Sequence, residues 1–367
     1  MFILSVLALL AGACVDIQVP EGGDGGWNLL GGDKPVTFST SIAAPETKTT
    51  SLSSIYTSFR VFAFYQAGNI SEDPGEHYVG SWADLGTRHW TPDFMYNQQV
   101  NWVTDHWEYT PVKYWPNNPE NTITFWAYAP ANAVVTLYQS GSSTVYSNTS
   151  SGLPHIMLTV PSTADTDFMV SEFDMVKDHS LNPNYPTYFT QDLSKMDLGE
   201  CVNFLFDHAL SKVNFEVSKE DPGNNYDVEL NIVTVKGILF TGVLMDGTWV
   251  AGTSVRNDFE VLKDEDSDIV LATSGLALSK SGILLPQRLD NTNENNTVLY
   301  VQYRYKNRAA VDYTTVSCSV PMKTILGSLD SSQQYTLKIK IAPGNPILFT
   351  AEVVKWDSNT NGYFNVD

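Results

Sequence analysis

The residue with the clearest chemical signature in this chain is Cys14, which follows a short apolar run. Residues 1–13 are almost entirely apolar, and small residues stand directly before the cysteine. This pattern is typical of a bacterial lipoprotein signal, in which the cysteine is acylated and becomes the mature N-terminus. The run is too short to cross a bilayer, which takes about 20 apolar residues. We therefore expect residues 1–14 to be a signal peptide that ends at the lipidated Cys14.

Two alternatives concerning the cysteines stay open. An ordinary signal peptide that happens to contain a cysteine would also fit. No Lys or Arg precedes the apolar run, which leaves open a start codon further upstream. If lipid occupies Cys14, Cys201 and Cys318 remain, and they could pair or lie buried as small apolar side chains. Three cysteines do not make a disulfide framework.

Aromatic residues gather between residues 78 and 128 and could bind a sugar by stacking on its apolar face. Trp115 and Trp126 belong to segments that resemble those of a known family, given below, and are expected in a core. Four further tryptophans lie in a polar, loop-rich stretch and are the candidates for ligand contact: Trp82, Trp90, Trp102 and Trp107. Large aromatic rings also fill cores, burying about 150–250 Å² each, so packing is the competing interpretation for these four as well.

The other reactive side chains form no recognisable catalytic or metal site. The histidines lack metal-ligand spacing, and His208 is expected to be structural. The acidic run 264–268 matches half of a calcium loop, but Ile269 stands where that loop needs glycine. No G-x-S-x-G elbow is present. We expect no enzymatic activity, no metal and no cofactor.

Charge argues against nucleic-acid binding. The 367 residues include 21 Lys+Arg and 41 Asp+Glu, for a formal net charge of −20. Such a surface repels nucleic acid and keeps an extracellular protein soluble.

The dominant hydrophobic period after the first 34 residues is two, which is typical of β-strands. Leu337, Ile339 and Ile341 alternate with lysines, and residues 299–305 alternate in the same way. Pro, Gly, Asn and Asp punctuate these runs, and no stretch keeps helical spacing for three turns. The pattern predicts an all-β protein built of antiparallel β-sandwiches.

Length and composition suggest two domains of similar size behind a linker. Residues 15–34 are rich in Gly and acidic residues and are expected to form a flexible tether. An aperiodic, polar stretch at 178–200 precedes a strong strand that starts at Val202. The predicted domains are therefore 35–198 and 199–367.

Several segments together resemble the fimbrillin family of Bacteroidales surface proteins, the type V fimbrial subunits. The first carries Tyr114-Trp115-Pro116 and then Phe125-Trp126-Ala127-Tyr128-Ala129-Pro130. Asp167-Phe168-Met169-Val170-Ser171 and Phe206-Asp207-His208-Ala209-Leu210-Ser211-Lys212-Val213 follow in the family's order. Leu284-Leu285-Pro286-Gln287 and Trp356 complete the resemblance, which covers the chain from about residue 35 to its end.

The resemblance implies two tandem transthyretin-like sandwich domains in a lipoprotein exported through the periplasm to the outer membrane and assembled into an adhesive fimbria. In this family a protease cuts after Arg or Lys and removes an N-terminal strand, whose groove is filled by a segment of another subunit. Residues 35–43 are the matching strand here, and Lys48 and Arg60 are the candidate processing sites. The partners implied are other fimbrial subunits, outer-membrane lipid through Cys14, and a host or bacterial surface ligand.

A surface glycan-binding lipoprotein that uses the aromatic loops is the alternative function. A fimbrial subunit should polymerise after limited proteolysis, whereas a glycan binder should stay monomeric and bind a polysaccharide. The resemblance does not distinguish stalk, tip, anchor and accessory subunits.

Overall fold

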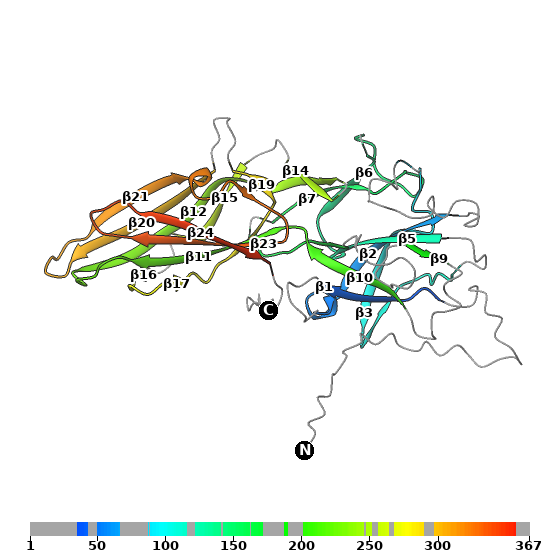
Figure 1. Ribbon diagram of the computed structural model, residues 1–367, viewed down its shortest axis with the longest axis horizontal. Helices are drawn as coiled ribbons and strands as arrows, with labels where there is room; N and C mark the ends of the chain where they lie inside the picture. The colour runs from blue at the N-terminus through cyan, green and yellow to red at the C-terminus, as the bar shows by residue number, and fades with distance from the viewer. Residues whose placement is uncertain are drawn as a thin grey trace, which may run out of the picture.

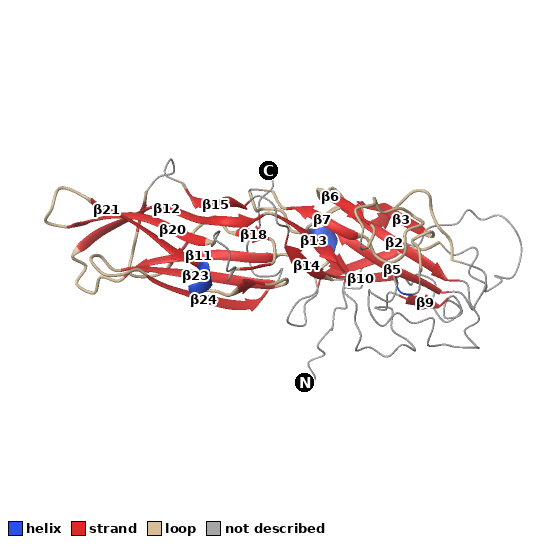
Figure 2. Ribbon diagram, turned by 90° about the horizontal axis from the view of Figure 1, so that it is seen from above, coloured by secondary structure: helices blue, strands red, loops and turns tan. Residues whose placement is uncertain are grey.

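In the computed structural model, the protein is an elongated molecule whose described residues lie mainly in β-strands (Figures 1 and 2). The structure describes residues 35–42, 50–66, 87, 89–115, 122–140, 142–161, 163–171, 187–189, 201–245, 247–251, 256–263, 268–289 and 297–356. The predictions on residues 1–34, Lys48, Trp82 and the segment after Trp356 fall outside these ranges. The short 3-10 turns η2 (Leu52–Ser54) and η5 (Met322–Thr324) lie between strands of the described part. No helix there is long and apolar enough to cross a membrane.

One end of the molecule is organised by an eight-stranded sheet in which β1 (Phe38–Ile42) is the end strand. Next to β1 the order continues through β10 (Val202–His208), β8 (Met169–Ser171), β5 (Thr122–Ala129), β2 (Ser58–Gln66), β3 (Met95–Val103) and β4 (His106–Glu108), with β9 (Thr187–Phe189) also on β5. A four-stranded sheet in the same half has the order β14 (Thr248–Ala251), β13 (Thr241–Met245), β7 (His155–Thr159) and β6 (Val135–Tyr138).

The central strands of the large sheet are apolar on both faces because each face covers a different core. On β2, Phe59 and Val61 belong to one cluster, while Phe62 and Phe64 belong to another. The first cluster also takes side chains of β1, β4 and β10. The second packs against β6 and β7 and continues into the other half of the molecule. A strand buried on both faces appears as a continuous apolar run, as residues 61–65 do.

The other end is a sandwich of two five-stranded sheets. One has the order β17 (Leu276–Ala277), β11 (Ser211–Lys219), β23 (Gln333–Ile341) and β24 (Leu348–Lys355), with β18 (Gly282–Leu284) on β11. The other has the order β15 (Arg256–Leu262), β12 (Tyr226–Leu239), β20 (Val298–Asn307) and β21 (Thr314–Pro321), with β16 (Ile269–Val270) on β12. A two-stranded sheet joins β19 (Gln287–Arg288) and β22 (Ser328–Leu329).

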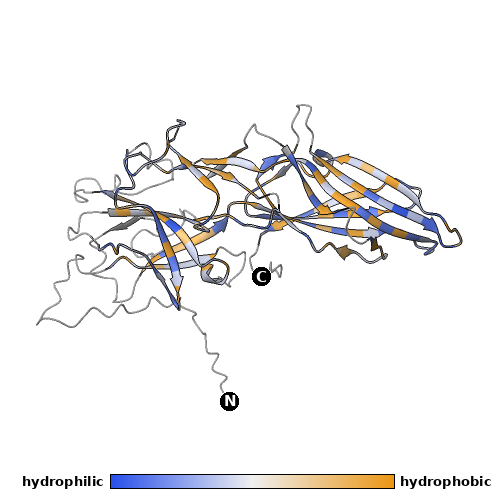
Figure 3. Ribbon diagram, turned by 180° about the vertical axis from the view of Figure 1, so that it is seen from behind, coloured by the Kyte–Doolittle hydropathy of each residue, from blue (hydrophilic) through white to orange (hydrophobic). Residues whose placement is uncertain are grey.

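The predicted all-β class and the predicted strand alternation are confirmed. Leu337, Ile339 and Ile341 are buried, and so are Leu299, Val301 and Tyr303. Figure 3 shows this as alternating colours along the strands of the sandwich. Alternation works here because successive side chains of a strand point to opposite faces.

The division between the halves differs from the expected boundary after residue 198. The strand that was expected to open the second domain, β10, lies between β1 and β8 in the first sheet. The next strand, β11, is the first that belongs to the second sandwich. The hairpin β13–β14 also returns to the first half, where β13 pairs with β7. Alternation cannot predict either result, because it shows which face is apolar but not which strand is the neighbour.

Candidate functional site

The candidate site is β1 together with the groove in which it lies. β1 runs parallel to β10, in a register from Phe38 opposite Val202 to Ile42 opposite Phe206. It ends the strand order of its sheet, which agrees with the expected strand over 35–43, of which residues 35–42 are described. An end strand can be removed without breaking a ladder between two other strands.

Phe38 is the main anchor of β1 in the groove. Its ring is 4% exposed. The ring centroid lies 6.0 Å from that of Phe59, 5.4 Å from Tyr109, 6.2 Å from Phe125 and 5.6 Å from Phe204. These partners come from β2, β5, β10 and the segment after β4. The single ring therefore joins both ends of the sheet around one core.

Polar contacts fix β1 at its start. The Tyr109 hydroxyl donates to the Val36 carbonyl oxygen at 2.8 Å, and the Val36 N–H donates to the Lys113 carbonyl at 2.9 Å. Burial raises the pKa of Tyr109 to about 12, so the phenol keeps its proton at neutral pH. An isolated bridge also joins Pro35 to Tyr114.

The middle of β1 contacts β4 through a hydrogen bond between side chains. The buried Trp107 indole N–H donates to Thr40 Oγ1 at 3.2 Å. Sequence analysis placed Trp107 among possible sugar-binding rings and assigned no role to Thr40. The available signal was the alternation Val36, Phe38, Thr40, Ile42, in which a hydroxyl interrupts a set of inward apolar side chains.

The two candidate processing residues lie in different settings. Lys48 lies outside the described residues, in the interval between Ile42 and Thr50, which are bridged to each other. Arg60 lies on β2, which pairs with β3 on one side and β5 on the other. Its side chain donates to the backbone carbonyls of Ala131 at 3.3 Å and Asn97 at 3.1 Å. The bond after Arg60 is thus held inside the sheet.

The described tryptophans among the sugar-binding candidates do not form an exposed platform. Trp90 and Trp107 are each 7% exposed and belong to different core clusters. Trp102 is partly buried, and its ring packs edge-on against Trp107 with centroids 5.0 Å apart. These positions favour the packing interpretation for Trp90 and Trp107.

His208 has the structural role expected of it, at the junction of the two halves. Its Nδ1 lies 2.6 Å from Asp167 Oδ2, and its ring stacks on Trp356 with centroids 3.9 Å apart. Ser332 Oγ donates to the His208 carbonyl at 2.7 Å, and the Trp356 N–H donates to the Ser332 carbonyl at 2.8 Å. These contacts attach the end of β24 to β10.

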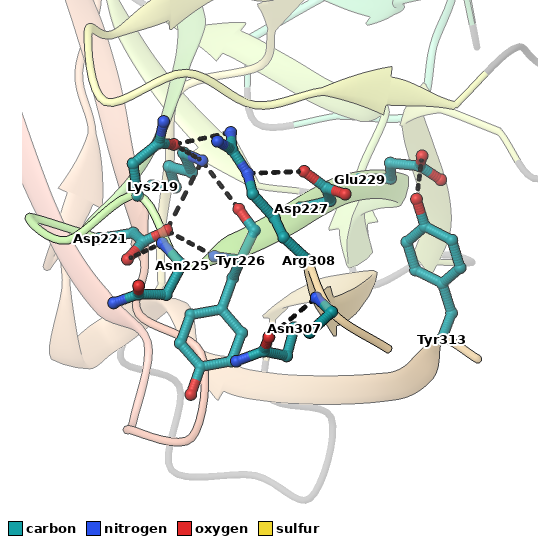
Figure 4. Close-up of polar contacts among 11 residues, drawn as sticks. Lys219, Asp221, Asn225, Tyr226, Asp227, Glu229, Asn307, Arg308 and Tyr313 are labelled. Carbon is teal, nitrogen blue, oxygen red and sulfur yellow. Dashed lines mark hydrogen bonds and ion pairs between the residues drawn. The ribbon is translucent and has the colours of Figure 1, made fainter. Parts of the chain in front are cut away.

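A polar cluster at the far end of the sandwich borders a hollow of about 590 Å³, lined in part by Lys219, Asp221 and Arg308 (Figure 4). Asp221 accepts the N–H groups of Asn225 at 3.0 Å and Tyr226 at 2.8 Å. Lys219 Nζ donates to Asn224 Oδ1 at 3.1 Å and to the Tyr226 carbonyl at 2.9 Å. The charged groups are thus used within the protein, and the cluster holds the turn between β11 and β12.

Two further questions concern metal-ligand clusters and the pairing of Cys318 in the described part of the chain. These contain no group of three or more His, Cys, Asp or Glu side chains arranged to hold a metal. Cys318 is free and partly buried on β21. Cys201 and Cys318 therefore do not pair, which settles one of the alternatives that the sequence left open.

Comparison with known proteins identifies the family. A model of the family described as fimbrillin-like matches residues 78–356, which is most of the chain. The chain belongs to the fimbrillin-like family. This confirms the resemblance found in the sequence motifs.

Two relatives illustrate how this fimbrillin-like chain compares with known proteins. It is 28% identical over 158 residues to the fimbrium subunit Fim1C of Phocaeicola vulgatus, a match that covers 42% of this chain and 36% of that protein. The crystal structure of a fimbrial protein from Bacteroides vulgatus aligns with a TM-score of 0.60 at 19% identity, covering 87% of this chain and 99% of that one. The structural match shows a shared fold.

Proposed function

We propose that this chain is a structural subunit of a cell-surface fimbria, assembled with other fimbrial subunits by protease-triggered strand exchange at β1. The family supports the fimbrial part of the proposal. The observation that supports the exchange is the position of β1, which ends its sheet while its inward side chains fill a core shared with β2, β5 and β10.

Removal of β1 would create a strong binding site for an extended segment. It would expose the edge of β10 and the rings of Phe59, Phe125 and Phe204, all of which contact Phe38. An open strand edge beside an apolar groove is a template for a strand from another chain, in which backbone hydrogen bonds provide affinity and alternate side chains provide specificity.

In this proposal, the protease releases β1 by cutting the chain after Lys48. A cut there leaves residues 35–42 attached to the groove only by non-covalent contacts. Arg60 is the less suitable site because a protease would first have to pull β2 out from between β3 and β5. Before this step, Cys14 would carry the lipid that holds the precursor in the outer membrane, and the finished fimbria would support adhesion.

Limited trypsin digestion of the purified chain without residues 1–14 tests the exchange. We expect a cut after Lys48 and then a ladder of species that survives detergent and collapses to one band on boiling. New N-termini are sequenced to locate the cut. A chain that is cut after Lys48 and stays monomeric, alone and with its co-expressed fimbrial subunits, would contradict strand exchange.

A pair of matched variants locates the processing site. Lys48→Gln should prevent both the cut and the ladder, whereas Arg60→Gln should leave the cut after residue 48 unchanged. The reverse result would move the processing site to β2.

A further inference from the structure

We propose that the groove selects the strand that replaces β1 by one polar position: the incoming segment must place a Ser or Thr hydroxyl against the indole N–H of Trp107. This inference rests on the proposed strand exchange and identifies the chemistry of the partner segment. The segment runs parallel to β10. In its sequence, an aromatic residue is followed two positions later by Ser or Thr, and an aliphatic residue stands two positions after that.

The Trp107 side chain lies among aromatic rings, and the hydrogen bond of its indole N–H is partly buried. Trp107 is 7% exposed, and its ring packs edge-on against Phe59, with centroids 4.8 Å apart, and against Trp102. Thr40 Oγ1 accepts the N–H at 3.2 Å. This acceptor leaves with β1, so the replacing strand has to supply another.

An incoming strand without an acceptor at this position would bury a donor with no partner. A buried donor left unsatisfied costs its full desolvation energy, whereas a Ser or Thr in the same place restores the bond. The groove therefore discriminates against an aliphatic side chain of the same shape. The groove therefore selects its strand mainly because a strand without the acceptor binds more weakly.

The neighbouring positions set the register. Phe38 fills the aromatic pocket two residues before Thr40, and Ile42 is completely buried two residues after it. A slip by one residue would turn every inward side chain outward. A slip by two would bring the aromatic ring to Trp107 and remove the hydroxyl.

Within the printed sequence, the pattern of an aromatic residue, then Ser or Thr, then Val, Ile or Leu at two-residue intervals occurs only at Phe38, Thr40 and Ile42. The strand β24 comes close, with Phe349, Ala351 and Val353, but has Ala at the position of the acceptor. The rule therefore excludes β24 of a second copy, and we expect the incoming segment to be a strand of another subunit that carries the acceptor.

The test uses the full chain with the recognition site of a sequence-specific protease inserted between Ala43 and Thr49. After the cut, fluorescein-labelled peptides are titrated and their anisotropy is measured. The peptides are residues 34–43, the same peptide with Thr40→Val, residues 346–355, and the last peptide with Ala351→Thr.

We expect the Thr40→Val peptide to bind about tenfold more weakly than its parent, and Ala351→Thr to improve binding of the β24 peptide by a similar factor. On a Trp107→Phe protein, which lacks the N–H, both differences should fall below about twofold. On a Trp102→Phe protein they should persist. Circular dichroism checks that both variants are folded.

Two results would overturn the inference, and they are distinguishable. Equal binding of the parent peptide and its Thr40→Val variant to the cut protein would refute the acceptor rule while leaving strand exchange intact. No binding of any peptide to the cut protein would refute exchange at β1 itself, and the rule with it.

Discussion

At the scale of single residues, the groove depends on a few side chains that make several contacts each. Phe38 contacts rings from four different parts of the chain. Thr40 and Tyr109 supply the polar contacts that align β1. The family resemblance and the short run at residues 35–43 were enough to predict the strand. The Trp107–Thr40 bond was not predicted, because those residues are far apart in sequence and their strands, β4 and β1, stand at opposite ends of the strand order.

Phe38→Ala should lower the free energy of unfolding by about 3–5 kcal/mol, because it removes a buried ring and leaves a cavity that the surrounding rings cannot fill. Chemical denaturation followed by tryptophan fluorescence measures the change. Phe349→Ala on the edge strand β24 is the matched control and should cost clearly less, since that ring is only partly buried. Equal losses would contradict the central role of Phe38.

Asp221 should make stability depend on pH in the acid range. Burial would raise the pKa of this carboxyl, but the N–H groups of Tyr226 and Asn225 and the charge of Lys219 outweigh it and hold the pKa below its usual value. The folded state therefore gains stability above pH about 4, where an unfolded Asp is ionised. This gain is lost as the pH falls through the lower folded value.

Asp221→Asn should accordingly lower the Tm at pH 6, and the gap to the unmodified protein should close towards pH about 2–3. Differential scanning calorimetry across this range measures both. An Asp227→Asn variant is the control, since its carboxylate accepts only an exposed bond from Arg308. A gap that stays constant with pH would show that ionisation of Asp221 does not stabilise the fold.

At the scale of elements, the strands differ in how firmly they are held. β2 lies between β3 and β5, whereas β1 and β24 each end a sheet. β24 is secured at its end, where Trp356 stacks on His208 and bonds to Ser332. If the contacts of Trp356 with His208 and Ser332 were lost, the end of β24 would separate locally from β23 at low energetic cost.

Trp356→Ala should speed hydrogen exchange of the β24 amides by at least about tenfold, because the stacking and burial that hold its end are lost. Exchange in β20, an inner strand of the facing sheet, should change much less. Mass spectrometry of peptides after exchange reads both strands. A uniform rise in β20 and β24 would instead indicate global destabilisation.

At the scale of the whole molecule, the two halves share one continuous core, since the cluster that contains Phe62 also contains Val213 and Leu337. Because the core is continuous, the two halves are packed against each other rather than joined only by a linker. The net charge of −20 makes copies of the chain repel one another, which opposes aggregation.

Cys14→Ser should abolish incorporation of a labelled fatty acid and move the precursor from the membrane fraction to the soluble fraction, because a signal without the cysteine has no thiol to acylate. Metabolic labelling and fractionation of cells test this. Cys318→Ser is the control and should remain lipidated, since that thiol lies on β21. Labelling that persists in Cys14→Ser would place the anchor elsewhere.

The sequence by itself determined the all-β class, the inward face of alternating strands such as β20 and β23, and the family. Turn residues separate the runs, and a period of two specifies the buried face, as at Leu337 and Ile339. These are local properties, which short stretches of chain express whatever their neighbours are.

Only the tertiary structure decided which strands are neighbours. It placed β10 beside β1, returned β13 to β7, and brought the Trp107 indole onto Thr40. Each of these contacts joins residues far apart in the chain, and many pairings of equally apolar strands satisfy the same local pattern. The choice among them depends on how all the side chains fill the two cores together, which no single segment encodes.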